Sequence, residues 1–257
     1  MDIKSIKGKV CGLIAGGNSL DEFESRILEF KDLPIEWVGL NNFTIAEDNI
    51  LKKINKQFNV VFDSATVTYY HEYEPNYRIP KYREYLGRKD SFLITADRLL
   101  LECFLTYAQD LYNKYKNKIF NFQGYLEENF VNYSILTKRP PNSLAYAIGS
   151  LILGQAKKVI IFGFDGISRE VNLKPEKILN TYYKPELVKV ERKLGFGEEY
   201  EVGGIVAECE NFDREFPELY INYRKAFGCN TELVICSPKT IIKSIRKINY
   251  NQLEDEL

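Results

Sequence analysis

Apolar residues along this chain form short continuous runs that alternate with longer stretches of helical spacing. The clearest run, residues 159–162, follows a helical stretch at 142–154 and precedes a Gly-x-Asp-Gly turn at 163–166. A strand without polar alternation must be covered on both faces, which is typical of a parallel sheet. Ligands of such sheets bind beyond the carboxyl ends of the strands, so this pattern makes Asp165 a candidate site residue.

The same pattern recurs over most of the chain. We predict further strands at residues 10–15, 35–40, 58–62, 92–95, 119–122 and 233–236. Helices are expected at about 20–28, 97–115 and 212–227, with a short basic helix after residue 238. This alternation predicts an α/β fold with a doubly wound, mostly parallel sheet, built as a single domain over residues 1–257.

Two stretches interrupt the alternation. Residues 69–89 are rich in tyrosine, proline and charge, and residues 167–205 contain the pair Tyr182-Tyr183. Long insertions in α/β domains are often lids or binding loops. We therefore expect a lid insertion at 167–205, and no linker indicates a second domain.

Composition narrows the class of protein. The formal net charge of -1 over 257 residues gives no general attraction to nucleic acid or to an anionic membrane. Five cysteines without C-x-x-C spacing indicate reduced, mostly buried thiols, and the single histidine, His71, has no nearby thiol for a zinc site. No signal peptide or membrane-spanning run is evident, so we expect a cytoplasmic protein without a metal site, and the oligomeric state stays open.

The turn Gly16-Gly17-Asn18-Ser19 follows the first predicted strand and precedes a helix capped by Asn18 or Ser19. Glycine permits close backbone approach, and free N–H groups at a helix start favour an anionic oxygen. We predict contact with a nucleotide or phosphate here. The sequence is neither a G-x-G-x-x-G fingerprint nor a P-loop, which disfavours NAD and Walker-type ATP binding.

Polar residues end the next two predicted strands at the same edge of the sheet. Asn41 and Asn42 can read a base or ribose by donor and acceptor pairing, and Asp63 can bind a ribose hydroxyl or a metal. Each of them can equally well form a turn. Their shared position beside the glycine turn favours a common site.

The remaining candidates have structural alternatives. Asn142 and Ser143 can cap the helix that follows them, or hold a phosphate or carboxylate at its start. Asp165 can form a turn, bind a metal or act as a base. Tyr182 and Tyr183 can line a lid or pack, and His71 is better explained as a surface or lid residue than as an acid or base.

These residues resemble the landmarks of a known group. Residues 13–20 (LIAGGNSL), 38–43 (VGLNNF), 61–63 (VFD), 142–166 and 233–238 (LVICSP) are similar, in order, to segments of the bacterial CMP-sialic acid-dependent sialyltransferases. They are also similar to proteins with a 6-hydroxymethylpterin diphosphokinase-like domain, which include the motility accessory factors. The similarity spans most of the chain through short segments.

The sialyltransferase resemblance implies a Rossmann-like sheet with a lid and a nucleotide-dependent glycosyltransferase. Such an enzyme moves a sialic-acid-like sugar from a CMP-type donor to a glycan or protein acceptor and needs no cofactor. CMP would lie against Gly16, Gly17, Asn18, Ser19, Asn41, Asn42, Asp63, Asn142 and Ser143, with Asp165, Tyr182 and Tyr183 as catalytic candidates.

Two departures keep alternatives open. An aspartate, Asp63, replaces the asparagine of those enzymes, and no histidine follows the Gly-x-Asp turn where they have their base. A transferase would then use Asp165 as the base or leave the proton to solvent. The alternatives are a pterin diphosphokinase-like enzyme using ATP and Mg²⁺ bound by Asp63 and Asp165, and a nucleotide-binding module without catalysis.

Overall fold

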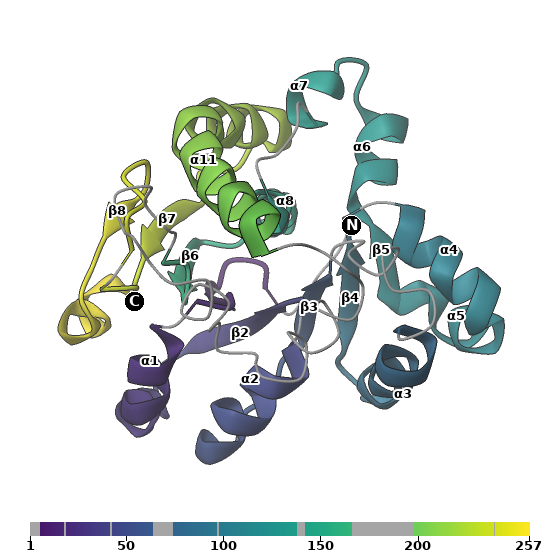
Figure 1. The fold of residues 1–257 in the computed structure, drawn as a ribbon, viewed down its shortest axis with the longest axis horizontal. Helices are drawn as coiled ribbons and strands as arrows, with labels where there is room; N and C mark the ends of the chain where they lie inside the picture. Colours follow the sequence, from purple (N-terminus) through teal and green to yellow (C-terminus); the bar gives the residue numbers. More distant parts are fainter. Residues whose placement is uncertain are drawn as a thin grey trace.

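The protein is built around one parallel sheet (Figure 1). A computed structural model describes residues 6–17, 19–41, 43–63, 74–96, 98–137, 142–165, 198–238 and 240–257. The sheet has eight strands in the order β5-β4-β3-β2-β1-β6-β7-β8, and all neighbouring strands are parallel. The chain therefore builds outward from β1 on one side and then crosses over to β6 on the other, which places the switch point between β1 and β6.

The first seven strands agree closely with the predicted apolar runs, and β8 was not predicted. They are β1 (Val10–Ile14), β2 (Ile35–Leu40), β3 (Val60–Asp63), β4 (Phe92–Thr95), β5 (Ile119–Asn121), β6 (Lys158–Phe162), β7 (Glu232–Ile235) and β8 (Arg246–Lys247). Every residue of β1, β3 and β6 is buried. These central strands are covered on both faces, as predicted for a parallel sheet.

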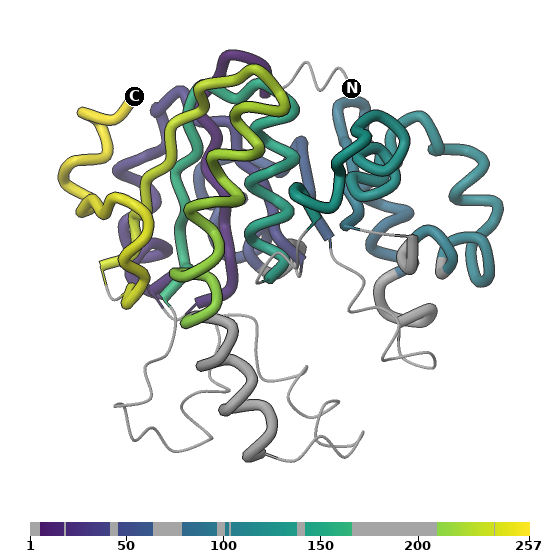
Figure 2. Tube along the Cα trace, turned by 90° about the horizontal axis from the view of Figure 1, so that it is seen from above, coloured from purple at the N-terminus to yellow at the C-terminus, as the bar shows by residue number. Residues whose placement is uncertain are grey.

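Helices cover both faces of the sheet, giving three layers (Figure 1). One face packs against α1 (Leu20–Arg26), η1 (Ile27–Phe30), α2 (Phe43–Asn49), η2 (Leu51–Ile54), α3 (Glu74–Gly87), α4 (Arg98–Tyr107), α5 (Gln109–Tyr115) and η5 (Tyr250–Gln252). The other packs against α6 (Phe122–Asn129), α7 (Ser134–Thr137), α8 (Ser143–Leu153) and α11 (Glu198–Phe227). Figure 2 shows α11 running beside α8 on this second face.

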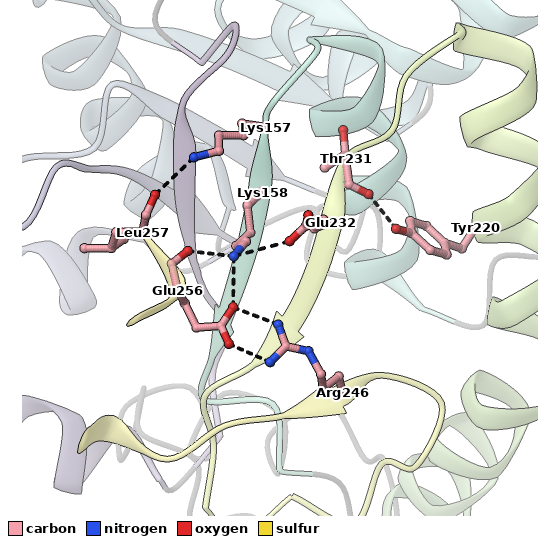
Figure 3. Close-up of polar contacts among 8 residues, drawn as sticks. All are labelled: Lys157, Lys158, Tyr220, Thr231, Glu232, Arg246, Glu256 and Leu257. Carbon is pink, nitrogen blue, oxygen red and sulfur yellow. Dashed lines mark hydrogen bonds and ion pairs between the residues drawn. The ribbon is translucent and has the colours of Figure 1, made fainter. Parts of the chain in front are cut away.

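The C-terminal segment closes the amino edge of the sheet, opposite the carboxyl ends of the strands (Figure 3). The 3-10 helix η6 (Glu254–Glu256) brings the Glu256 carboxylate 2.9 Å from Lys158 Nζ and 2.7 Å from Arg246 Nη2. Lys158 Nζ also donates to the Glu256 carbonyl oxygen at 2.7 Å and lies 3.3 Å from Glu232 Oε2. The nearly buried Lys158 charge thus has two carboxylate partners, as a buried charge requires.

Two sequence predictions of helices are wrong. The helix expected at 97–115 is two helices, α4 and α5, because Ala108 between them has φ -152° and its side chain is buried against the core. The basic helix expected after residue 238 is instead an extended segment that ends in β8. Its apolar residues Ile242, Ile245 and Ile248 pack on the sheet, while Arg246 and Lys247 pair with β7.

The structure also describes parts of the two interruptions, and the lid stays a prediction. Most of 69–89 is not a loop, because residues 74–87 form α3, whose Tyr82 and Tyr85 are buried in the core. Of the lid expected at 167–205, residues 198–205 belong to α11, and residues 167–197 lie outside the described residues.

Candidate functional site

The turns after β1 and β6 bond to each other at the switch point of the sheet. Ala15 N donates to Phe162 O at 2.8 Å, and Gly17 N donates to Gly163 O at 2.6 Å. Gly163 has φ +68°, and a side chain there would also collide with Leu20. Glycine is therefore required at the point where the β6 turn passes α1.

Asp165 joins these two turns through its side chain. Its Oδ2 accepts a hydrogen bond from Ser19 N at 2.7 Å, and its Oδ1 accepts one from Ser19 Oγ at 2.5 Å. Ser19 is completely buried and Asp165 is partly exposed. Asp165 thus supplies the negative charge at the start of α1, where the helix favours an anion.

The end of β7 and the C-terminal segment complete this network. Ser237 Oγ accepts from Phe164 N at 3.2 Å and lies 3.4 Å from Ser19 Oγ. Tyr250 OH donates to Ser19 O at 3.3 Å, and burial raises the pKa of Tyr250, which keeps the hydroxyl protonated as a donor. Three adjacent strands and the C-terminal segment therefore meet at Ser19.

One sequence expectation for the glycine turn is wrong. Its N–H groups were expected to be free for an anion, but Gly17 N and Ser19 N have the acceptors just described, and Leu20 N donates to Gly17 O at 3.1 Å. Ser19 is the N-cap residue of α1, one of the two positions predicted, but its hydroxyl bonds to Asp165 and makes no side-chain cap. Gly16 and Gly17 are partly exposed, and their contact with a nucleotide stays a prediction.

Asn41 lies just beyond β2 at the same edge of the sheet. Its N–H donates to Phe62 O at 2.8 Å, which extends the pairing with β3, and its φ of 55° lies in the left-handed region. Asparagine tolerates this conformation better than most residues, and such outliers often occur at functional sites. Asn41 is partly exposed, and its contact with a nucleotide stays a prediction.

Asp63 ends β3 and points toward α3. It is 1% exposed, and its Oδ2 accepts a short hydrogen bond from Tyr82 OH. Val61, two residues earlier on the same face of the strand, packs in the core that α3 covers. In this structure Asp63 ties β3 to α3, and its contact with a nucleotide stays a prediction.

Asn142 and Ser143 begin α8, as predicted. Asn142 is the N-cap, with extended backbone, and its side-chain oxygen accepts from Ala145 N at 3.2 Å. Both residues are partly exposed. The capping alternative is therefore confirmed for Asn142, and a further role in binding stays a prediction.

The remaining candidates lie outside the described residues: Asn18, Asn42, His71, Tyr182 and Tyr183.

The structure adds Ser237, Tyr250 and Tyr82, which sequence reasoning missed. Ser237 had the signal used elsewhere, a polar residue directly after a buried strand. Tyr82 and Tyr250 had none, since each reaches the site from a distant helix.

Over the described parts of the chain, no group of three histidine, cysteine, aspartate or glutamate residues is placed to hold a metal ion. The two aspartates that a Mg²⁺ site would need have different partners, since Asp63 bonds to Tyr82 and Asp165 bonds to Ser19. Nor does any described helix combine the length and the apolar character needed to cross a membrane.

Solved structures with this architecture include several sialyltransferase complexes. One is the sialyltransferase CstII with a trisaccharide acceptor and CMP (TM-score 0.52, 13% identity), and the match covers 95% of this chain and 87% of that one. The fold is sialyltransferase-like. CstII from Campylobacter jejuni with the substrate analogue CMP-3FNeuAc and a CstII variant with CMP match with TM-scores of 0.50, identities of 13% and the same coverage.

This likeness supports the sialyltransferase half of the sequence resemblance and not the motility accessory factor half. At 13% identity it shows the fold alone. No protein-family model matches the chain, and no curated protein sequence matches it.

Proposed function

We propose that this protein is a glycosyltransferase that moves a sialic-acid-like sugar from a CMP-type donor to a glycan or protein acceptor. The observation that carries the proposal is that hydrogen bonds join the turns after β1, β6 and β7 at the switch point of a sialyltransferase-like sheet. Ligands of open α/β sheets bind at this point. The similar structures hold CMP, a CMP-sugar analogue and a trisaccharide acceptor.

The proposed donor site uses the partly exposed residues of the carboxyl edge. Gly16 and Gly17 offer a surface without side chains, Asn41 offers an amide, and Asn142 with Ser143 begins a helix of 11 residues. Ser19 and Asp63 support this surface from beneath, because both are buried. Asn18, Asn42, Tyr182 and Tyr183 remain proposed contacts from the sequence.

The reaction is a displacement at the anomeric carbon of the donor sugar. The acceptor hydroxyl oxygen forms a new bond to this carbon, and the bond from the carbon to the phosphate oxygen breaks. CMP leaves with the electron pair of that bond. The acceptor proton passes to a base or to solvent.

The first test is binding of CMP, measured by isothermal titration calorimetry with UDP and ATP-Mg²⁺ as comparison ligands. We expect CMP to bind without metal. The Asn41→Ala and Ser143→Ala variants should each lose about 1 kcal/mol, or about fivefold in affinity, for one lost hydrogen bond. Binding of ATP only with Mg²⁺ would support the diphosphokinase-like alternative instead.

The second test is transfer. Incubation with CMP-sialic acid and an oligosaccharide acceptor should release CMP and lengthen the glycan, as measured by chromatography and mass spectrometry.

A second candidate function is a nucleotide-binding module without catalysis, which is favoured by the engagement of both Asp165 oxygens with Ser19. Binding of CMP without release of CMP from any CMP-sugar would support the module.

A further inference from the structure

We propose that Asp165 is a positioning residue that holds the donor surface in shape, and that it is not the proton acceptor of the transfer. This inference rests on the proposed function. It departs from the sequence-based expectation that, in a chain without the family histidine, Asp165 would serve as the base.

The first argument is that both carboxylate oxygens are already occupied. Oδ2 lies 2.7 Å from Ser19 N, and Oδ1 lies 2.5 Å from Ser19 Oγ. A proton taken up from the acceptor would sit on an oxygen that already accepts a hydrogen bond from Ser19, and it would disturb the contact with this buried residue.

The second argument is the placement of Asp165 within the fold. Its backbone carbonyl accepts from Ile241 N at 2.8 Å, and Phe164 N beside it donates to Ser237 Oγ. Asp165 therefore links the β6 turn to the β1 turn by its side chain and to the segment after β7 by its backbone. A general base must reach its substrate, whereas a residue bound on both sides is suited to fixing the shape of the site.

The third argument concerns Gly17, which lies against the Asp165 carboxylate. A Cβ on Gly17 would lie 2.6 Å from Asp165 Oδ2 and 2.6 Å from Gly163 O. The turn and the carboxylate therefore fit as one unit without free space. Asp165 already places a negative charge at the start of α1. A donor phosphate would therefore be repelled from the N–H groups at the start of this helix and must be bound by other groups at this edge.

The experiment compares Asp165→Asn, Asp165→Glu, Ser19→Ala and the double variant Asp165→Asn/Ser19→Ala with the wild type. Asp110→Asn is the matched control, because it removes an exposed carboxylate that pairs with Arg83 on the protein surface. Transfer from CMP-sialic acid is measured across pH, and CMP affinity is measured by calorimetry.

For a positioning residue, Ser19→Ala and Asp165→Asn should both weaken CMP binding and lower kcat/KM by about 10- to 100-fold. The acidic limb of the pH–rate profile should keep its midpoint, the double variant should be no worse than Asp165→Asn, and the control should stay within about twofold. A loss of the acidic limb in Asp165→Asn with unchanged CMP affinity would overturn the proposal.

Two further measurements keep the inference testable on its own. If Asp165→Asn does not fold, Ser19→Ala decides, because a base role predicts unchanged CMP affinity in that variant and a positioning role predicts a loss. If the wild type neither binds CMP nor transfers sugar, the proposed function fails. The coupling between Asp165 and Ser19 is then tested by a double-mutant cycle in urea unfolding. If the effects of Ser19→Ala and Asp165→Asn on the free energy of unfolding were additive, the positioning role would be overturned.

Discussion

Gly17 shows at the scale of one residue how a missing methyl group sets the geometry of the site. The space that a Cβ would need is occupied by the Asp165 carboxylate and the Gly163 carbonyl oxygen. Neither atom is the end of a flexible chain free to move, since Asp165 is held by Ser19 and Gly163 O accepts from Gly17 N. Gly17 is therefore explained by packing as well as by any contact with a ligand.

We expect Gly17→Ala to lower the free energy of unfolding by about 2 kcal/mol, because the extra methyl must displace backbone or carboxylate atoms. Urea unfolding followed by tryptophan fluorescence measures the change. Gly87→Ala is the control, since its Cβ would meet only Tyr115 OH at 3.6 Å, and alanine favours the helix. If both variants were equally stable, the close fit at Gly17 would have no energetic weight.

At the scale of elements, α8 and α11 pack closely because Gly149 has no side chain. A Cβ there would lie 2.6 Å from two ring atoms of Tyr223 and 3.0 Å from Phe122. Tyr223 is fully buried, and its hydroxyl donates to Leu136 O at 3.0 Å, so its ring is held from both sides. The position of α8, and with it the position of Asn142 and Ser143, depends on this contact.

We expect Gly149→Ala to destabilise the fold by about 1–3 kcal/mol through overpacking, despite the better helix propensity of alanine. It should also weaken CMP binding, because α8 would shift at its contact with α11. Thermal unfolding and calorimetry with CMP give the two values. An increase in stability would show that the Tyr223 ring has room to move.

The last turn of the chain, η6, is a second element whose packing can be tested. It lies at the amino edge of the sheet, away from the site. Hydrogen bonds from Arg246 and Lys158 lower the pKa of Glu256 from 4.5 to about 2. The charged form is thus favoured in the folded protein. The stability that it contributes is present above pH 4.5 and is lost as the pH falls towards 2.

We expect Glu256→Gln to reduce the free energy of unfolding at pH 7 by about 1–2 kcal/mol, as for a lost hydrogen bond to a charged group. The difference from the wild type should shrink between pH 4.5 and about 2. Urea unfolding at several pH values measures it, and exposed Glu254→Gln serves as the control. A difference that does not depend on pH over this range would contradict the assigned cause.

At the scale of the whole molecule, the proposed donor site and the ion-pair cluster of Lys158, Arg246 and Glu256 lie at opposite edges of the sheet. The first follows the carboxyl ends of the strands, and the second lies at their amino ends, as Figure 3 shows for Lys158 and Glu232. Hydrogen exchange should therefore show CMP protecting Gly16, Gly17, the β6 turn and the first turn of α8, with no change around Lys158 and Glu256. Protection confined to the amino edge would contradict the proposed site.

The sheet was predictable from the sequence because its signal is local. Continuously apolar runs such as those of β1 and β6 need only cover on both faces, and polar residues after them mark the carboxyl edge. The use of those polar residues was not predictable, because it depends on partners far along the chain. Asp63 bonds to Tyr82, and Asp165 bonds to Ser19, and neither pairing leaves a periodic trace.

The sequence predicted neither the break at Ala108 nor the extended path to β8, because both depend on packing against distant parts of the chain. A helical pattern at 97–115 is correct in period, but the core selects a bend that brings Ala108 and Leu111 inward. Tertiary packing overrides local propensity at such points.

The partners of Ser19 have a consequence for how the protein is made. They lie 146, 218 and 231 residues further along the chain, at Asp165, Ser237 and Tyr250. The N-terminal turn therefore leaves the ribosome long before the groups that fix it, and contacts of such long sequence separation form slowly. A nascent chain that stops before Tyr250 would lack this contact, so the groups around Ser19 would reach their final arrangement only after Tyr250 has been added.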